Sequence, residues 1–412
     1  MSTNLAVRLT PDALTHVRLG HPWVFDRGIS SVRGGRNGDG TGDPGDVAVM
    51  FDDRNRFVAV GLWDPGSPIR IKVLQASTPV EVGAELWNDR LAHALARRWE
   101  LLGSADSDAL RVLHGENDRM PGLVVDLYRT VAVVKLYSDA WLAHLEEFLD
   151  VLQAAIWSIT GVVLRLSRRV ASSPLAQQRG LSDGQVIRGS VRDGRTTFSE
   201  HGLRFTADVR HGQKTGWFLD QRDNRALVAS MARGTRMLDV FCCGGGFGVH
   251  AAAGGARHVH SVDLSPHAVD EAASHMVLNR DVREVGNATH VGTVGDAFEV
   301  MDELGRSGER FDLVVVDPPS FASRQVDVPG ALRAYGALTA LAVGLIRPGG
   351  TLVQASCSSR VSTSDFAGIV TRAAQRAGAE LAVLARTAQP IDHPVGFPEG
   401  AYLKAIFARV ER

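Results

Sequence analysis

The stretch Met237-Leu238-Asp239-Val240-Phe241-Cys242-Cys243-Gly244-Gly245-Gly246-Phe247-Gly248 decides the fold. Residues 236–241 are mostly apolar and predict a buried strand, the glycines predict a tight turn, and a helix is expected from about Phe247. Glycines at such a turn let the backbone approach a ligand and leave the helix N–H groups facing it. Val249 breaks the G-x-G-x-x-G spacing, so the stretch matches a dinucleotide fingerprint poorly.

Strand and helix patterns alternate regularly on the C-terminal side of this stretch. Ser265 is a natural N-cap and Pro266 suits the first helical position, which predicts a helix as far as Leu278. Further strands are expected at 258–262, 311–316 and 351–355, with a helix at 331–346. Continuous apolar strands that alternate with helices are typical of a parallel doubly wound sheet, which binds ligands at the carboxyl ends of its strands.

Acidic residues lie at three successive strand ends of this predicted sheet. Asp239 lies in the first strand, Asp263 ends the second, and Asp296 follows the next apolar stretch. A carboxylate at the second position can accept both hydroxyls of a ribose, and one at the third can accept from an adenine amino group. Each acid alone is typical of a turn or a helix cap, but the three together favour one nucleoside pocket.

The rest of the chain divides by pattern. Short strands broken by Gly, Pro and Asp predict a β-rich domain over 1–78, with a surface loop at 34–45. An α+β domain is expected over 79–199, and the α/β domain over 200–412. The stripe of Leu86, Leu91, Leu95 and Trp99 predicts a helix at 81–102.

Composition excludes several classes of protein. The formal net charge of −1 excludes a polycation that coats nucleic acid or acidic membranes. The three cysteines form no disulfide framework, which fits a reducing cytosol. No apolar run approaches the ~20 residues of a membrane span, and the N-terminus lacks a signal-peptide pattern. We expect a cytoplasmic protein with no membrane partner, and no spacing of Cys or His indicates a metal site.

Four motifs together resemble the class I S-adenosylmethionine-dependent methyltransferases. They are D-V-F-x-x-x-G-G-F at 239–247, V-D at 262–263, G-D-A at 295–297 and D-P-P-S-F at 317–321. The resemblance implies a Rossmann-like fold and S-adenosylmethionine as cofactor. It places Asp239, Gly245 and Gly246 at the methionine end, Asp263 at the ribose and Asp296 at the adenine.

A narrower resemblance covers nearly the whole chain. The segment at 213–222 looks like the cofactor-flanking motif of the bacterial 23S rRNA cytosine-5 methyltransferases that carry an N-terminal PUA domain, and it implies cofactor contacts for Lys214, Asp220 and Arg222. The matching segments elsewhere are 21–25, 121–126, 200–202, 397–399 and 402–404. The loop at 34–45 departs from the family as an insertion. So does Cys242-Cys243-Gly244, where a polar residue or Tyr is expected.

The loop Asp317-Pro318-Pro319-Ser320-Phe321 follows a buried strand. Its prolines fix an extended backbone that offers carbonyl groups, and Phe321 is placed to stack on a planar base. This pattern predicts methylation of a base and does not choose the atom, since many related enzymes methylate exocyclic amino groups without a nucleophile. The resemblance gives Asp317 a cofactor contact and a hydrogen bond to the ring nitrogen of the base.

Cys357, just past the strand at 351–355, favours carbon 5 of cytosine. That carbon is too weak a nucleophile to attack a sulfonium methyl group unaided, and a thiolate that adds to carbon 6 activates it. We therefore predict Cys357 as the nucleophile, although a free cysteine is most often a small buried residue. Cys242 and Cys243 are expected to pack and not to react.

An acid-free stretch between 151 and 182 carries Arg165, Arg168, Arg169 and Arg179. Arginine matches phosphate geometry, so we predict that Arg165, Arg168 and Arg169 contact RNA, with a solvated basic face as the alternative. The expected partner is 23S rRNA or a large-subunit precursor, and a homodimer is compatible with the sequence. Two other functions stay open. One is a guanine or adenine N-methyltransferase that uses the D-P-P-S-F loop alone, and the other is a non-catalytic RNA-binding assembly factor.

Overall fold

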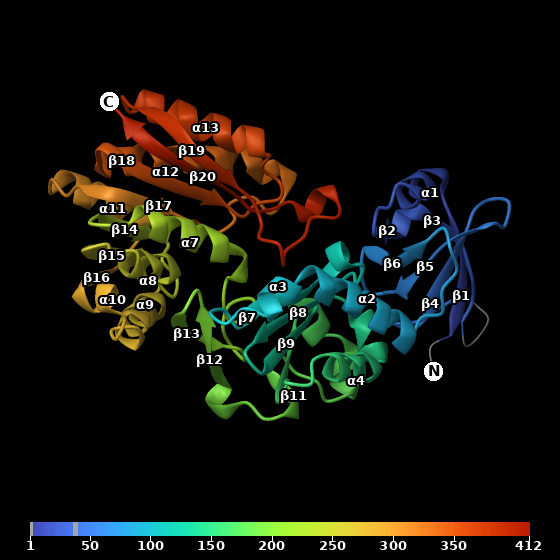
Figure 1. Cartoon of the computed structure of the whole chain (residues 1–412). Coiled ribbons are helices and arrows are strands. Elements are labelled where there is room, and N and C mark those ends of the chain that lie inside the picture. Colours follow the sequence, from blue (N-terminus) through green and yellow to red (C-terminus); the bar gives the residue numbers. More distant parts are fainter. Residues whose placement is uncertain (1–2, 36–39) are drawn as a thin grey trace. The chain divides into compact units, whose positions relative to one another are not determined.

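The computed structural model describes residues 3–35 and 40–412 (Figure 1). The chain folds into two compact units, and each takes residues from more than one part of the sequence. The first unit comprises Met1–Phe198, Thr206–Leu219 and Ile391–Gly400, and the second comprises Ser199–Phe205, Asp220–Pro390 and Ala401–Arg412. The first unit thus contains both regions that the sequence predicts as separate domains at 1–78 and 79–199.

The N-terminal part of the first unit is a six-stranded sheet with the strand order β2-β6-β5-β4-β1-β3. Its strands are β1 (Asn4–Leu9), β2 (Trp23–Phe25), β3 (Ile29–Gly34), β4 (Val47–Phe51), β5 (Phe57–Trp63) and β6 (Ile69–Ala76). Helix α1 (Pro11–Arg18) begins where Thr10 caps it, because the Thr10 side chain accepts from the Ala13 N–H and Pro11 fits the first turn. The predicted β-rich region is confirmed. Part of the predicted loop at 34–45 lies outside the described residues.

The middle of the first unit is a five-stranded sheet with the order β11-β10-β9-β8-β7. Its strands are β7 (Ala109–His114), β8 (Leu123–Tyr128), β9 (Val131–Leu136), β10 (Gly161–Leu166) and β11 (Gln185–Gly189). The helices of this region are α2 (Ala84–Arg97), α3 (Trp99–Leu102), α4 (Leu145–Ala155), α5 (Arg168–Ala171) and α6 (Pro174–Gln178). Trp87 and Trp141 pack against each other in the core, with ring centroids 5.0 Å apart.

One helix of the middle region is shorter than predicted. The expected stripe at 81–102 breaks at Arg98, which caps α2 with a φ of −108°. The Arg98 side chain is fully buried and pairs with Asp118, so the chain turns there to bring the guanidinium inward. Trp99 therefore leaves the apolar stripe and is 67% exposed. After this region β12 (Arg195–Glu200) and β13 (Leu203–Asp208) form a separate two-stranded sheet.

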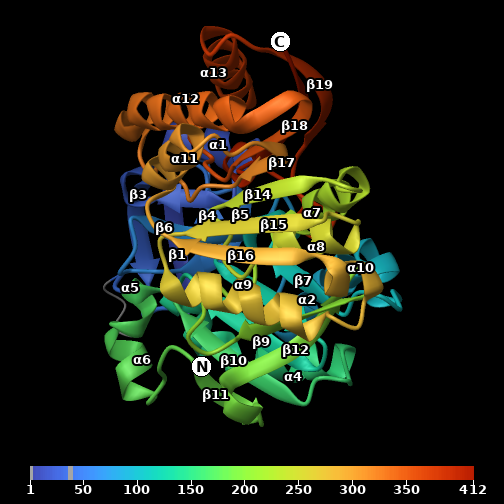
Figure 2. The same ribbon diagram turned by 90° about the vertical axis from the view of Figure 1, so that its left-hand side faces the viewer.

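The second unit is built on a seven-stranded sheet with the order β16-β15-β14-β17-β18-β20-β19 (Figure 2). Its strands are β14 (Arg236–Val240), β15 (His258–Asp263), β16 (Thr289–Val294), β17 (Phe311–Val316), β18 (Ile346–Ser356), β19 (Glu380–Thr387) and β20 (Lys404–Glu411). The first five strands are parallel to one another, while β20 runs antiparallel to both β18 and β19. The predicted doubly wound parallel sheet is confirmed, and it ends in an antiparallel pair that the sequence patterns did not indicate.

Helices cover this sheet according to the alternation of side chains along each strand. Leu238 and Val240 of β14 belong to one core cluster with apolar residues of α11 (Ala297–Arg306), α12 (Val328–Leu345) and α13 (Thr363–Arg376). Asp239 points to the opposite face. The remaining helices are α7 (Arg222–Met231), α8 (Gly246–Ala253), α9 (Pro266–Leu278) and α10 (Arg283–Asn287). Ser265 caps α9 as predicted, accepting from the Ala268 N–H.

Helix α12 has the length and composition of a membrane span when the turn before it is included, over Gln325–Leu345. Half of that stretch is nevertheless buried inside the unit. Tyr335, Leu338 and Ala342 are fully buried there in the cluster that covers β17 and β18. We therefore interpret α12 as a core helix of the sheet.

Candidate active site

The carboxyl ends of the parallel strands bring most of the predicted site residues of the second unit to one edge of the sheet. Asp263 ends β15, Asp296 follows β16, Asp317 follows β17 and Cys357 follows β18. Asp239 lies one residue before the end of β14, between Ser261 and Val315 of its two neighbours. Residues that follow parallel strands share an edge of the sheet, which is where such folds bind ligands.

The Asp263 carboxylate at the end of β15 accepts backbone hydrogen bonds from the glycine turn after β14 and from its own loop. Cys243 N–H donates to Asp263 Oδ2 over 3.0 Å, and Ser265 N–H donates to Asp263 Oδ1 over 2.9 Å. Gly245 has a φ of 72° and opens α8, and a Cβ at this position would lie 2.5 Å from the Ala272 side chain of α9. Gly245 is therefore required by backbone conformation and by the close approach of α9. Gly246 is buried as the first residue of α8.

Asp239 is the most strongly perturbed acid of the site. Its pKa is raised to about 7, mainly by burial and also by the neighbouring Asp317 and Asp263, while a hydrogen bond from Gly248 N–H opposes the shift. That bond reaches Oδ2 over 3.0 Å, and Oδ1 is buried without a hydrogen-bond partner among the described residues. A buried oxygen without a donor is costly, and three close carboxyl groups favour a cation. These features fit the positively charged methionine end of S-adenosylmethionine.

Asp296 is exposed and caps α11, its Oδ1 accepting from the N–H groups of Phe298 and Glu299. The cap accounts for an acid at this position by itself. Contact with the adenine therefore stays a prediction for Asp296, as contact with the ribose does for Asp263.

The loops after β17 and β18 are joined by hydrogen bonds. The Cys357 thiol donates to Pro318 O over a long distance of 3.9 Å, and Ser358 Oγ donates to Ala322 O over 2.9 Å. Cys357 is half-buried, so its sulfur is reachable. Asp317 N–H donates to Val240 O over 3.3 Å, which ties the same loop to the end of β14. The structure thus holds Cys357 against the D-P-P-S-F loop.

Phe321 packs inward. Its ring centroid lies 5.2 Å from that of Tyr335, and Phe321 contacts the core cluster of α12. Pro318 is buried and Pro319 is exposed. Stacking of Phe321 on a base stays a prediction. In the structure the ring packs on Tyr335 and supports the loop.

The other two thiols differ from Cys357. Cys242 is buried with Val269 and Ala272, and burial together with the nearby Asp239 and Asp263 raises its pKa far above the ordinary range. Burial also raises the pKa of Cys243 to about 11. Both cysteines are therefore protonated at neutral pH, as expected for residues that pack.

Asp220 and Arg222 lie at the start of α7 in a buried polar network. Tyr402 OH donates to Asp220 Oδ2 over 2.7 Å, and the buried Arg222 Nε donates to Asp223 over 3.2 Å. Next to them Arg225 makes a two-pronged ion pair with the buried Glu200, over 2.6 and 2.7 Å. These contacts hold α7 in place, and the predicted cofactor contacts of Asp220 and Arg222 stay predictions.

Lys214 lies in the first unit. Its ammonium sits over the Phe218 ring, 4.3 Å from the centroid, and its carbonyl accepts from Lys135 Nζ over 3.0 Å. The predicted contact of Lys214 with the cofactor stays a prediction.

The predicted RNA path of the first unit is largely engaged with protein groups. Arg165 is buried, and it donates to Asp183 over 3.0 Å and to Gly212 O over 3.0 Å. Arg169 pairs with Asp64 and Asp139 over 2.8 and 2.9 Å. Arg168 is exposed. The pairs explain these two arginines as structural residues, and the RNA path stays a prediction.

Comparison with known proteins identifies the family. A family model of S-adenosylmethionine-dependent methyltransferases matches residues 123–409, and a PUA-like domain model matches residues 7–76. The chain belongs to the S-adenosylmethionine-dependent methyltransferases. Its predicted cofactor, Rossmann-like fold and PUA-like N-terminal domain are thereby confirmed.

Several relatives are similar over nearly their whole length. The "Ribosomal RNA large subunit methyltransferase" of Deinococcus radiodurans is 44% identical over 411 residues, covering 99% of this chain and 98% of the relative. "Ribosomal RNA large subunit methyltransferase I" of Tolumonas auensis is 34% identical over 397 residues, which cover 94% of this chain and 95% of the relative. A methyltransferase crystallised with S-adenosylhomocysteine, SMU.776, has the same fold with a TM-score of 0.81 at 18% identity, covering 99% of this methyltransferase and 100% of that one.

Lys404 is the site residue whose role the sequence did not indicate. It opens β20, is 5% exposed, and donates to the carbonyls of Ser358 and Val361 over 2.5 and 2.6 Å. The signal was a lysine at the head of the apolar run Ala405-Ile406-Phe407-Ala408, since a lysine among buried residues needs internal acceptors.

Proposed function

We propose that this methyltransferase forms 5-methylcytosine in large-subunit rRNA, with Cys357 as the nucleophile. The observation that carries the proposal is the position of Cys357. Its half-buried thiol lies against Pro318 O at the carboxyl edge of the sheet, on the loop next to Asp317. The names of the relatives and the PUA-like domain support rRNA, or a large-subunit precursor, as the substrate.

The chemistry explains why a thiol is useful at this position. The Cys357 thiolate adds to carbon 6 of the cytosine, so a sulfur–carbon bond forms while the 5,6 double bond opens toward the ring nitrogen. Asp317, with a proton on its carboxyl group, would donate a hydrogen bond to that nitrogen. Bound S-adenosylmethionine would supply the methyl group to carbon 5 and leave as S-adenosylhomocysteine. Loss of the proton from carbon 5 to water restores the double bond and releases the thiolate.

Residues of the second unit account for cofactor binding. The buried Asp239, its unpartnered oxygen and the nearby Asp263 provide negative charge for the methionine end. The first turn of α8, which opens after Gly245, provides backbone N–H groups at the same edge of the sheet.

RNA that contains 5-fluorocytosine tests this proposal. With fluorine in place of the hydrogen at carbon 5, no proton can be removed after methyl transfer, so the enzyme should remain covalently attached to the RNA in a denaturing gel. Cys357→Ser should abolish the covalent adduct while the protein still binds S-adenosylmethionine in calorimetry. The control is Ser359→Ala, a change at an exposed residue of the same loop, which should form as much covalent adduct as the native enzyme.

Two results would contradict the proposal. Full methylation by Cys357→Ser would favour the N-methyltransferase alternative, in which the D-P-P-S-F loop acts without a nucleophile. Failure of the native protein to bind S-adenosylmethionine would favour a non-catalytic assembly factor.

A further inference from the structure

Lys404 is a buried cation beside the proposed nucleophile. The antiparallel register of β18 and β20 pairs Ser356 with Lys404, and Cys357 is the next residue along β18. The Lys404 ammonium donates to the carbonyls of Ser358 and Val361, so it closes the turn that Cys357 begins. A lysine side chain thus fixes the backbone on the C-terminal side of the thiol.

The environment of Lys404 lacks the usual partner of a buried lysine. Among residues 3–35 and 40–412 no carboxylate pairs with its ammonium, and the two carbonyls take two of its three N–H groups. Burial lowers its pKa to about 8, and the Cys357 thiolate opposes that shift. A buried ammonium without a counter-ion is costly, and the Cys357 thiolate is an anion whose charge acts on it.

Other titratable groups also face Cys357. Tyr335 of α12 accepts a hydrogen bond from Ser356 Oγ over 2.8 Å, and burial raises the Tyr335 pKa to about 12, so this phenol is neutral. Asp317 begins the neighbouring loop, and its carboxyl group disfavours a thiolate when it is ionised. Lys404 places a positive charge beside this loop.

We propose that Lys404 is a positioning residue for Cys357, which fixes the 357–361 turn and holds the Cys357 sulfur as a thiolate before attack and after release of the base. This inference rests on the proposed cytosine-5 chemistry. The thiol proton leaves to water, the ammonium keeps its own protons, and the same ion pair forms again when the sulfur–carbon bond breaks. A cation next to a thiol favours the thiolate form.

The rate of alkylation of Cys357 by iodoacetamide tests the inference. It is followed peptide by peptide in the full chain as a function of pH, without RNA. Lys404→Gln should move the midpoint of the Cys357 profile up by at least one pH unit, so that alkylation near pH 7 falls about tenfold. Lys404→Arg should restore the native midpoint. Arg376→Gln, an exposed change of the same charge in the same unit, should not move it.

Three outcomes decide between the proposals. An unchanged midpoint in Lys404→Gln, with native thermal unfolding, overturns the role of Lys404 and leaves the nucleophile in place. If the Lys404→Gln protein fails to fold, Lys404→Arg becomes the test. The inference is then overturned if the Cys357 midpoint of Lys404→Arg rises to that of Cys357 in the unfolded protein. A shifted midpoint with no 5-fluorocytosine adduct in the native enzyme supports the ion pair and contradicts the proposed function.

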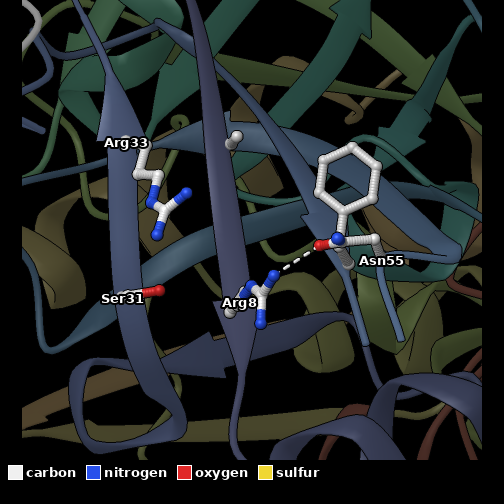
Figure 3. Close-up of a pocket in the computed structure, with 6 residues that line it drawn as sticks. Arg8, Ser31, Arg33 and Asn55 are labelled. Atoms are coloured by element: carbon white, nitrogen blue, oxygen red, sulfur yellow. Dashed lines mark hydrogen bonds between the residues drawn. The ribbon is translucent and has the colours of Figure 1, made fainter. Parts of the chain in front are cut away.

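A second, independent observation concerns the outer face of the PUA-like sheet. Ala6 of β1 pairs with Arg33 of β3 and Val49 of β4, and one step along, Arg8 pairs with Ser31 and Phe51. Because Ala6 is small, a hollow of about 270 Å³ opens between these strands. Its lining residues are Ala6, Arg8, Ser31, Arg33, Phe51 and Asn55. Figure 3 shows Arg33 and Arg8 beside the hollow, with Arg8 Nη2 donating to Asn55 Oδ1 over 2.5 Å.

The chemistry of this hollow suits one nucleotide of single-stranded RNA. Two guanidinium groups match phosphate oxygens, and the aromatic ring of Phe51 on the neighbouring strand β4 offers a surface on which a base can stack. Among the residues that the structure describes, no carboxylate lines the hollow. Asp52, which follows Phe51, is buried and paired with Arg56 and Arg18. We infer that Arg8, Arg33 and Phe51 form an RNA-binding surface, a role that rests on the proposed RNA substrate.

Steady-state methylation of an rRNA fragment tests this surface. Arg8→Ala together with Arg33→Ala should raise KM about tenfold with kcat unchanged. The slope of the logarithm of the binding constant against the logarithm of the salt concentration should fall in magnitude by the amount expected for about one to two lost phosphate contacts. The control is Arg27→Ala together with Arg192→Ala. It removes two exposed arginines of the same unit and so loses the same charge away from the hollow. A KM and salt dependence equal to those of this control would overturn the inference, whereas the adduct with 5-fluorocytosine would still form.

Discussion

The loops after β14 and β18 both carry cysteine at the same edge of one sheet, yet their surroundings differ in charge. Around Cys242 and Cys243 lie Asp239 and Asp263, and burial with these acids holds both thiols protonated. Beside Cys357 lies the ammonium of Lys404. We infer that burial first, and nearby charge second, distinguish the two unreactive thiols from the proposed nucleophile Cys357.

The largest expected effect is on kcat and comes from removing the Cys357 sulfur in the loop after β18. Cys357→Ser should lower kcat by about 10⁴-fold, since serine is a far weaker nucleophile at neutral pH. Cofactor affinity should stay within about twofold, because Cys357 lies on a different strand end from Asp239. Single-turnover methylation and calorimetry measure the two quantities, and a variant with activity within tenfold of native would break the comparison.

Asp239, near the end of β14, should make the free energy of unfolding depend on pH. The pKa of Asp239 is about 7 in the folded protein, against an ordinary value of 3.8 for an aspartate side chain. The folded state therefore keeps a proton that the unfolded chain loses, and stability falls as pH rises from 4 to 7. The loss amounts to about 4 kcal/mol.

Asp239→Asn should remove that part of the pH dependence, as urea unfolding at several pH values would show. Asp270→Asn, an exposed change on α9, should keep it. Equal pH profiles for native protein and Asp239→Asn would contradict the assignment of a buried, protonated carboxyl group.

Alkylation should separate the three thiols by order of reaction. At pH 8 the Cys243 thiol, with a pKa of about 11, exists as thiolate in about one molecule in a thousand. Cys357 should therefore react about a hundredfold faster, and Cys242 should react after unfolding. Peptide-resolved mass spectrometry gives the three rates, and modification of Cys243 before Cys357 would reverse the comparison.

The smallest expected effect concerns the cofactor. Asp239→Asn removes a negative charge from the methionine end and should weaken S-adenosylmethionine binding about tenfold to thirtyfold. Calorimetry at pH 8 measures this change, again with Asp270→Asn as the control. Unchanged affinity would place the methionine end away from Asp239.

Much of the second unit was predictable, because its signals are local. The apolar run before Asp239, the Ser265-Pro266 cap and the apolar run before Asp317 each predict their element without knowledge of the rest. The parallel order of the strands then places the acids and Cys357 on one edge. The family motifs identified the cofactor for the same reason, since they lie at the ends of those strands.

What the sequence did not predict depends on long-range contacts. The break at Arg98 follows from its pairing with Asp118, twenty residues away in sequence, and this pairing exposes Trp99. The internal partners of Arg165 and Arg169 come from other elements, so an acid-free stretch resembled a free basic surface. Lys404 meets Cys357 only through the β18–β20 register, which no local pattern reveals.

The proposed cytosine-5 methylation can be measured by mass-spectrometric mapping of 23S rRNA from a strain that lacks this protein. We expect one 5-methylcytidine to disappear and to return when the native gene is restored, but not with Cys357→Ser. Loss of a methylated guanosine or adenosine, with every 5-methylcytidine retained, would contradict it.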